Sequence, residues 1–320
     1  MRQQAFEEQR EARWLRVERI LDGLDAGREV DAREFPQLYR QLCQDLALAR
    51  ERQFGGHLVD RLNGLALRGH QWLYQARVRS SPRVLGFLAR DFPRAVRAEW
   101  RIFAFMALLF AGSALGLLAL LQASPDLVHS FIGPQRLREL EEMYDPAAGH
   151  LGIPRGYDDD VMMFGYYILN NVGIAFRTFA SGLFFGVGSL FFIAFNGVFL
   201  GIVSGHLTNL GYGSTFYPFV IGHGAFELTA IVLSGVAGMK LGMALLSPGP
   251  RSRLQALREA VQGSIRILYG AAAMLLVAAL IEAFWSSSTL FPASIKIAVG
   301  VALWVAVATY LLAAGRADAA

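Results

Sequence analysis

A stretch of 20 residues without a charged side chain, Ile102 to Leu121, constrains this chain more than any other feature. At about 1.5 Å per helical residue, such a stretch crosses the hydrocarbon core of a bilayer, which is roughly 30 Å thick. Only 18% of the 320 residues are charged, against about 25% in soluble proteins. The chain is therefore predicted to be an integral membrane protein, with the lipid bilayer as its first partner.

Residues 1–100 are predicted to form a soluble helical region that precedes the first span. Apolar residues recur with helical spacing over 3–24, 35–48 and 56–78, and a short fourth helix over 82–97 leads into the membrane. The first residues lack an apolar h-region, so we expect no cleaved signal peptide and a cytoplasmic location. Seven arginines between residues 77 and 101 face only two acidic residues, which favours contact with anionic lipid and argues against a nucleic-acid partner.

Residues 101–320 are predicted to form a transmembrane domain, so the fold class is an all-α, polytopic membrane helical bundle. The expected spans are 102–121, 161–176, 178–207, 216–246, 267–285 and 291–314. An acidic, extracytoplasmic loop at 122–160 separates the first two. Six spans make the basic segment 247–266 cytoplasmic and put both termini inside, in agreement with the positive-inside rule. Five spans are the alternative, with the short segment 161–176 lying on the membrane surface.

Ionisable and amide side chains lie at similar depths in these predicted spans, where charge is costly. His223 and Glu227 are four residues apart and therefore share one helix face. The predicted intramembrane polar site consists of His223, Glu227, Glu282, Asn196, His206, Asn170 and Asn171. Lys240 and Lys296 lie near helix ends, where long side chains reach the interface, and are not assigned to the site.

Three interpretations of this polar site stay open. The groups can be hydrogen-bonded contacts that fix helix packing, a path for a small solute or proton, or a catalytic centre. A zinc peptidase is disfavoured because the H-E-x-x-H pattern is missing, and no serine nucleophile stands in a recognised intramembrane motif. We therefore predict no catalytic residue, no metal and no cofactor. A non-enzymatic role is favoured over an enzymatic one.

Glycines at four-residue spacing indicate where helices approach each other closely. The predicted packing positions are Gly197, Gly201 and Gly205 on the third expected span and Gly238 and Gly242 on the fourth. A tight pair of these two spans would hold Asn196 close to Glu227. The same ladder can pack between copies of the chain, so a homo-oligomer stays an alternative.

Several short motifs occur in order along the predicted membrane domain. They are Asn170-Asn171, Asn196-Gly197, Leu200-Gly201, His223-Gly224-Ala225-Phe226-Glu227-Leu228 and Glu282-Ala283. This set resembles the integral-membrane stage II sporulation protein M family. The segments 38–47 and 93–100 are similar to its longer, non-sporulation branch.

The resemblance implies a scaffold or assembly factor in the bacterial cytoplasmic (inner) membrane. In spore formers the family member anchors cell-wall hydrolases, whereas longer relatives are commonly encoded beside MoxR-type AAA ATPases and other membrane proteins. The expected partners are therefore a cytoplasmic MoxR-type AAA ATPase and other envelope proteins. The added N-terminal region and the last span, 291–314, argue against the sporulation role. A transporter or channel-like subunit that moves a small solute or proton through the His/Glu/Asn site is the alternative function.

Overall fold

The protein divides into two compact units, Met1–Leu85 and Gly86–Ala320. The structure is a computed structural model that describes residues 3–28, 30–31, 33–75, 81–153 and 160–316. Within these ranges every regular element is a helix, as predicted. The segment 86–100, which precedes the first span, packs with the second unit, where α5 (Phe92–Ala98) contacts the last two long helices.

The first unit is built from three helices that share one apolar core. They are α1 (Gln3–Asp25), α2 (Phe35–Glu51) and α3 (Gly56–Gln75), and a short helix, α4 (Ser81–Gly86), follows. Phe6, Trp14 and Leu62 are fully buried in this core, because their spacing puts them on the inner helix faces. Asp45 is buried too, and its Oδ2 accepts a hydrogen bond from Trp14 Nε1 at 3.0 Å. The polar end of the tryptophan is therefore satisfied inside the core.

The second unit contains the long helices expected in the membrane. They are α6 (Trp100–Ala123), α9 (Asp160–Ala180), α10 (Val187–Asn209), α11 (Gly213–Leu246), α12 (Arg253–Ile281) and α13 (Ala293–Ala313). The shorter elements are η1 (Phe87–Asp91), α5, η2 (Pro125–Leu127), α7 (Val128–Phe131), α8 (Pro134–Tyr144), η4 (Ser181–Leu183) and η5 (Glu282–Ser286), a π-helical turn that continues α12. The loop predicted at 122–160 thus contains short helices, and its residues 154–159, with Asp158 and Asp159, lie outside the described residues.

In the described part of the chain, five helices are long and apolar enough to cross a membrane. They are α6, α10, α11, α12 with η5, and α13. The helix α9 is not among them, since its 21 residues include Asn170, Asn171 and Arg177. By length and composition alone, the number of spans therefore equals the five-span alternative.

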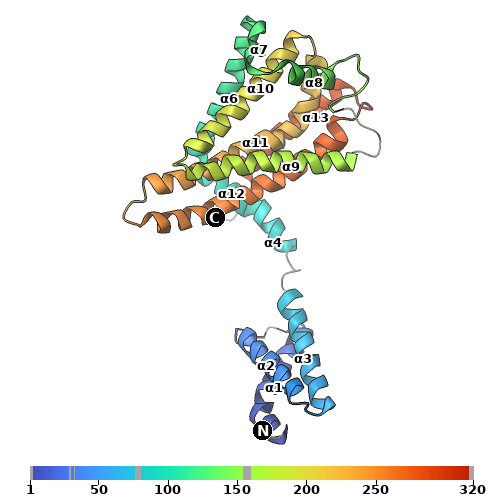
Figure 1. Cartoon of the computed structure of the whole chain (residues 1–320), viewed down its shortest axis with the longest axis vertical. Helices are drawn as coiled ribbons and strands as arrows, with labels where there is room; N and C mark the ends of the chain where they lie inside the picture. The colour runs from blue at the N-terminus through green and yellow to red at the C-terminus, as the bar shows by residue number, and fades with distance from the viewer. Residues whose placement is uncertain (1–2, 29, 32, 76–80, 154–159, 317–320) are drawn as a thin grey trace. The chain divides into compact units, whose positions relative to one another are not determined.

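The packing of α9 nevertheless follows the full depth of the bundle. Near its start, Met163 belongs to one apolar cluster with Ala283 of η5, the turn that continues α12. Its last turn lies against Gly238 of α11, and Lys240 contacts Gly263 near the beginning of α12. Residues 263 and 283 are separated by about 30 Å of helix. The helix α9, drawn across α11 and α12 in Figure 1, therefore covers the depth expected of a crossing helix.

The central helix of the second unit is α11, which contacts α6, α9, α10, α12 and α13. Most of its residues between 216 and 242 are buried, and small residues permit this close packing. A side chain at Gly182 would overlap the backbone of Gly238, and one at Gly242 would overlap Gly186. Gly186 also has a φ of +83°, a conformation that favours glycine. The turn between α9 and α10 therefore depends on these glycines.

The glycine ladder of α10 faces α6. A Cβ at Gly201 would overlap the backbone oxygen of Ala114, and Gly197 and Gly205 face α6 in the same way. At the end of this contact, Gln122 Nε2 donates to Gly205 O at 3.0 Å. The ladder therefore joins the first and third expected spans, whereas α10 meets α11, the fourth expected span, through Ser189 and Ile193.

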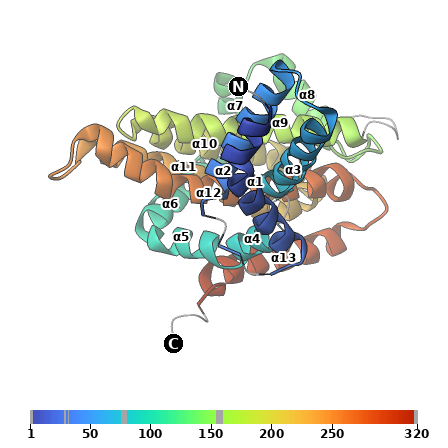
Figure 2. The same cartoon turned by 90° about the horizontal axis from the view of Figure 1, so that it is seen from below.

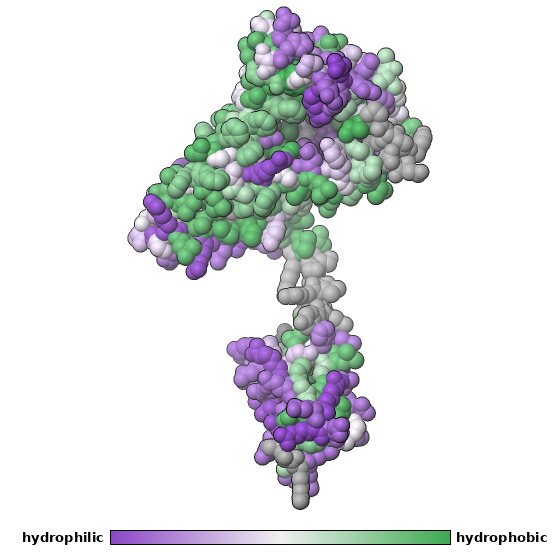
Figure 3. All heavy atoms as spheres, viewed as in Figure 1, coloured by the Kyte–Doolittle hydropathy of each residue, from purple (hydrophilic) through white to green (hydrophobic). Residues whose placement is uncertain are grey.

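The outer surfaces of the two units differ in polarity. In Figure 3 the first unit is mostly hydrophilic, whereas the second is largely hydrophobic between hydrophilic ends. Exposed apolar side chains such as Leu108, Leu169 and Phe191 contribute to this hydrophobic surface, which is typical of helices that face lipid. The end of α11 and the start of α12 form a hairpin that extends beyond the neighbouring helices (Figures 1 and 2).

Candidate functional site

Three pairs of side chains, each spaced four residues apart, converge in the second unit. They are His223 and Glu227 on α11, Glu282 and Ser286 on η5, and Tyr167 and Asn171 on α9. Such spacing puts both members of a pair on one helix face. We call these six residues the polar cluster. Its members are drawn from three elements that are far apart in the sequence.

His223 is the centre of the polar cluster and is 5% exposed. Its Nδ1 lies 3.0 Å from Ser286 Oγ, and its Nε2 lies 4.0 Å from Glu227 Oε2. The Phe219 ring packs edge-on against the imidazole, with 5.4 Å between ring centroids. Glu282 completes the group, because one ligand atom each from His223, Glu227 and Glu282 lie within 4.8 Å of one another.

The two adjacent asparagines of α9 differ in their contacts. Asn170 Nδ2 donates to Asn171 Oδ1 at 3.0 Å. Asn171 is 2% exposed and lies beside Glu227, but its Nδ2 has no hydrogen-bond partner of normal geometry among the described residues. An unsatisfied donor at such a buried position is rare in proteins. Asn171 therefore lies beside Glu227 without a well-formed hydrogen bond.

Tyr144 approaches the polar cluster from the end of α8, outside the spans. Its ring packs edge-on against Phe216, with 5.1 Å between ring centroids. Burial raises the pKa of the Tyr144 phenol, and the neighbouring Glu282, Tyr167 and Glu227 raise it further. The phenol therefore keeps its proton and can donate a hydrogen bond. Sequence reasoning missed this residue because it lies in the loop, and no spacing rule links it to α11.

Lys296 also lies beside the polar cluster, in contrast to the expectation that it reaches the interface. It is 1% exposed, and its Nζ donates to Ser286 O at 2.7 Å. The expectation for Lys296 was wrong because a long, flexible side chain can also turn inward when a carbonyl oxygen is there to accept. Lys240 behaves differently, since it forms an ion pair with Glu99 near the start of α6.

Two residues of the predicted site lie in other contacts. His206 Nε2 is 2.8 Å from Glu141 Oε1, in a contact that joins α10 to α8. Asn196 Nδ2 donates to Phe192 O in its own helix at 2.7 Å. A similar depth did not bring these residues to the polar cluster, because depth does not determine the direction in which a helix face points.

The chemistry of the polar cluster is that of two carboxylates around an imidazole. Such groups can bind a cation, transfer a proton or hold helices together. Ser286, His223 and Glu227 are also the residue types of a hydrolase triad. However, the 4.0 Å between His223 Nε2 and Glu227 Oε2 is too long for the hydrogen bond that a triad needs. This geometry does not support nucleophilic catalysis.

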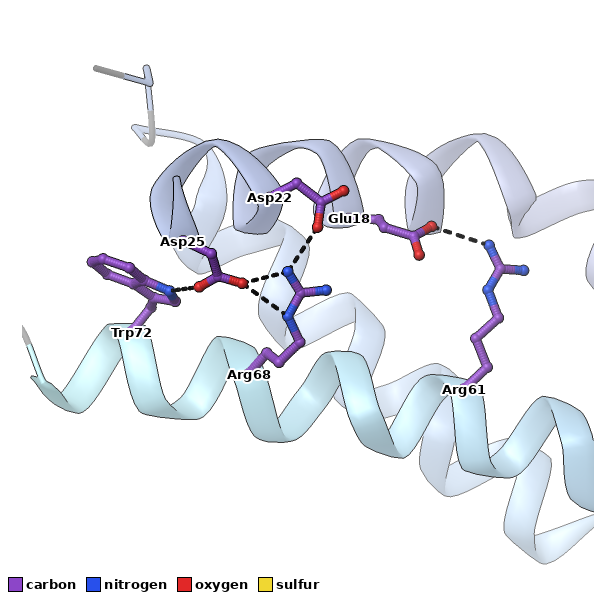
Figure 4. Close-up of polar contacts among 6 residues, drawn as sticks. All are labelled: Glu18, Asp22, Asp25, Arg61, Arg68 and Trp72. Atoms are coloured by element: carbon purple, nitrogen blue, oxygen red, sulfur yellow. Dashed lines mark hydrogen bonds and ion pairs between the residues drawn. The ribbon is translucent and has the colours of Figure 1, made fainter. Parts of the chain in front are cut away.

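The first unit has a separate set of polar contacts between α1 and α3 (Figure 4). Arg68 bridges Asp22 and Asp25, with nitrogen–oxygen distances of 2.7 and 2.5 Å. Trp72 Nε1 donates to Asp25 as well. Nearer the start of α1, Glu11 and Glu18 form ion pairs with Arg61. Hydrogen bonds from Trp72 and Arg68 lower the pKa of Asp25. Because these charges already pair with one another, they clamp two helices rather than form an open site.

The fold and the polar cluster define a polytopic helical membrane protein with a separate N-terminal helical unit. Residues 102–287 match the family described as Stage II sporulation protein M. Because this match covers more than half of the 320 residues, the chain belongs to the stage II sporulation protein M family. Residues 4–75 match a second family, described as Domain of unknown function (DUF8413). No curated protein and no solved structure matches the chain.

The family match confirms the resemblance that the ordered motifs indicated. It contains all six residues of the polar cluster as well as Tyr144. It does not contain α13, which carries Lys296, or the three helices of the first unit.

Proposed function

We propose that this protein is a scaffold or assembly factor in the bacterial cytoplasmic membrane. The first unit would recruit a cytoplasmic partner, while the second unit holds an envelope complex. The observation that carries this proposal is that each unit has its own core. The core of the first unit is formed by side chains on the inner faces of its helices. Its hydrophilic outer surface is therefore available to a partner.

The surroundings of the polar cluster favour a structural role over conduction. Four grooves described on the second unit are lined mainly by apolar side chains, and none of their lining residues belongs to the polar cluster. A path for a hydrated solute needs polar groups along its length. A buried polar cluster that links α9, α11 and η5 instead holds these elements in one arrangement.

The charge distribution supports a cytoplasmic side for the partner. Arg97 donates to Leu311 O and Ala314 O, so the start of α6 and the end of α13 lie at one end of the bundle. Arginines in the hairpin between α11 and α12 add positive charge, as the positive-inside rule requires of cytoplasmic segments. We propose a MoxR-type AAA ATPase as the soluble partner, on the basis of the family resemblance.

Affinity capture from the native host tests the scaffold proposal. The full chain should recover the ATPase together with envelope proteins, whereas a chain of residues 86–320 should recover only the envelope proteins. The matched control replaces residues 1–85 with an unrelated three-helix bundle of similar size. Recovery of the same partners, in the same amounts, by all three chains would contradict the proposal.

A second candidate, a transporter or channel-like subunit, is favoured by the close approach of His223, Glu227 and Glu282 inside the second unit. Ionisable groups in such positions frequently form proton or ion pathways. In sealed liposomes, Glu227→Gln should then reduce proton or solute flux about 100-fold or more, because a positioned proton-transfer group typically contributes about 10²–10⁴-fold. Glu141→Gln, in the separate pair with His206, is the control. Equal flux through the unchanged protein, Glu227→Gln and Glu141→Gln would remove this candidate.

A further inference from the structure

We propose that His223, Glu227 and Glu282 bind a divalent transition-metal ion inside the second unit, with zinc as the test ion. The inference goes beyond the scaffold proposal and does not depend on it. It departs from the sequence-based expectation of no metal. That expectation was based on the lack of a second histidine near His223, whereas the third ligand is contributed by η5.

The distances between the three side chains suit a metal after small side-chain rotations. One imidazole nitrogen and one oxygen from each carboxylate lie within 4.8 Å of one another. Zinc–ligand bonds of about 2.0–2.1 Å in a tetrahedral site separate the ligand atoms by about 3.4 Å. The His223 Nε2 to Glu227 Oε2 distance of 4.0 Å is already close to that value. The proposal therefore requires the two glutamate side chains to rotate toward a shared ion, as flexible side chains can, to close the remaining gap.

The contacts of His223 prepare it as a ligand. Its Nδ1 lies 3.0 Å from Ser286 Oγ, so a proton on Nδ1 can be donated to the hydroxyl. Nε2 then keeps its lone pair and points toward Glu227. Histidine ligands commonly have this arrangement, in which the second ring nitrogen is held by a neighbouring acceptor. Lys296 binds the Ser286 carbonyl, which holds its positive charge in a defined contact.

The amide of Asn171 is a second observation beside the three candidate ligands. This side chain is 2% exposed and lies beside Glu227, but its Nδ2 makes no hydrogen bond of normal geometry among the residues that the structure describes. Three protein ligands leave the fourth position of a tetrahedral metal to water. A metal-bound water or the second oxygen of Glu227 would accept the hydrogen bond that Asn171 offers.

The donor set and its charge determine the class of cation. One nitrogen and two carboxylates suit zinc, iron or manganese, whereas magnesium and calcium prefer about six or more oxygen ligands. Two carboxylates this close repel each other in an apolar interior. A divalent ion would neutralise both charges and so reduce the cost of holding them together between helices.

The test uses the full chain in lipid nanodiscs, stripped with a chelator and then dialysed against zinc. Elemental analysis should find one zinc per chain. Competition with a chromogenic chelator should show that Glu227→Gln and Glu282→Gln each weaken zinc binding at least about tenfold, the lower end of the effect known for residues that only support a ligand. Glu141→Gln is the matched control and should bind zinc as tightly as the unchanged protein.

A second measurement keeps the proposal testable if a variant does not fold. Cobalt added to the unchanged, metal-free chain should give the visible absorption bands of a tetrahedral site, and equimolar zinc should remove them. Less than one-tenth of a zinc per chain at saturation would overturn the proposal. Equal zinc affinity in the Glu227, Glu282 and Glu141 variants would also overturn it. Neither outcome affects partner capture by the first unit, so this test and the scaffold test fail separately.

Discussion

The two units place polar and apolar side chains in opposite ways. In the first unit Trp14 and Leu62 are buried, while Arg68 and its acidic partners lie at the surface. In the second unit apolar residues such as Leu169 cover the outside, while His223 lies inside with two glutamates. Water solvates the charges of the first unit, but lipid cannot solvate those of the second. Polar groups in the membrane unit must therefore find partners inside the protein.

Each unit also contains a buried polar group, and the two groups differ in how well they are satisfied. Asp45 in the first unit is 4% exposed, and both Trp14 and Arg13 donate to it. Asn171 in the second unit is buried to a similar extent, yet its amide nitrogen has no partner of normal geometry in the described part of the chain. A satisfied buried group stabilises a core, whereas a buried donor without a well-formed bond needs an explanation, which a bound ligand would provide at Asn171.

The largest effect should come from the core of the first unit. Trp14→Ala removes a fully buried ring and its bond to Asp45, so the free energy of unfolding of this unit should fall by about 3–5 kcal/mol. Hydrogen exchange of the full chain should then become faster in α1 to α3 and stay unchanged in α11. Leu67→Ala, at a position that is 60% exposed, is the control. An equal acceleration in α11 would show that the two cores are not independent.

A smaller effect is expected inside the second unit. Ser286→Ala removes the partner of His223 Nδ1 at a fully buried position, which should cost about 1–3 kcal/mol. The free energy of unfolding can be measured by steric trapping in bicelles. Ser287→Ala, whose hydroxyl donates to Ala283 O of the preceding turn, is the matched control. Equal losses for both variants would mean that the contact between α11 and η5 adds no stability.

A comparable substitution at the surface of the first unit should lower the free energy of unfolding by less than Ser286→Ala does. Arg61→Ala breaks ion pairs with Glu11 and Glu18 on α1, and exposed pairs of this kind contribute about 0.2–1 kcal/mol. Salt at 1 M should remove most of the difference between Arg61→Ala and the unchanged protein. A loss as large as that of Ser286→Ala would contradict the contrast between the two environments.

The smallest effect should follow from acidification. Trp72 and Arg68 lower the pKa of Asp25, and Arg33 lowers the pKa of Asp31. A carboxyl group with a lowered pKa in the folded state adds stability above its unfolded pKa of about 3.9 and loses it as the pH falls through the folded value. The melting temperature of the first unit should therefore drop below about pH 4, and Asp25→Asn should reduce this drop. An unchanged pH profile in Asp25→Asn would contradict this assignment.

Much of the helical framework follows from the sequence. The predicted helix over 35–48 corresponds to α2, and the predicted helix over 56–78 corresponds to α3, which ends at Gln75. The span over 178–207 was less accurate, because η4 and the left-handed Gly186 separate α9 from α10. Apolar periodicity reports a helix well, but a short turn between two apolar helices leaves little trace in it.

The sequence by itself determined that His223 and Glu227 share a face and that Glu282 has a similar depth. Depth follows from counting residues at about 1.5 Å each along a helix. Only the tertiary structure decided which side chains meet: Asn171 and Ser286 belong to the polar cluster and Tyr144 lies beside it, whereas Asn196 and His206 make other contacts. The rotation of each helix and the identity of its neighbours depend on side-chain packing across the whole bundle, which no local pattern encodes.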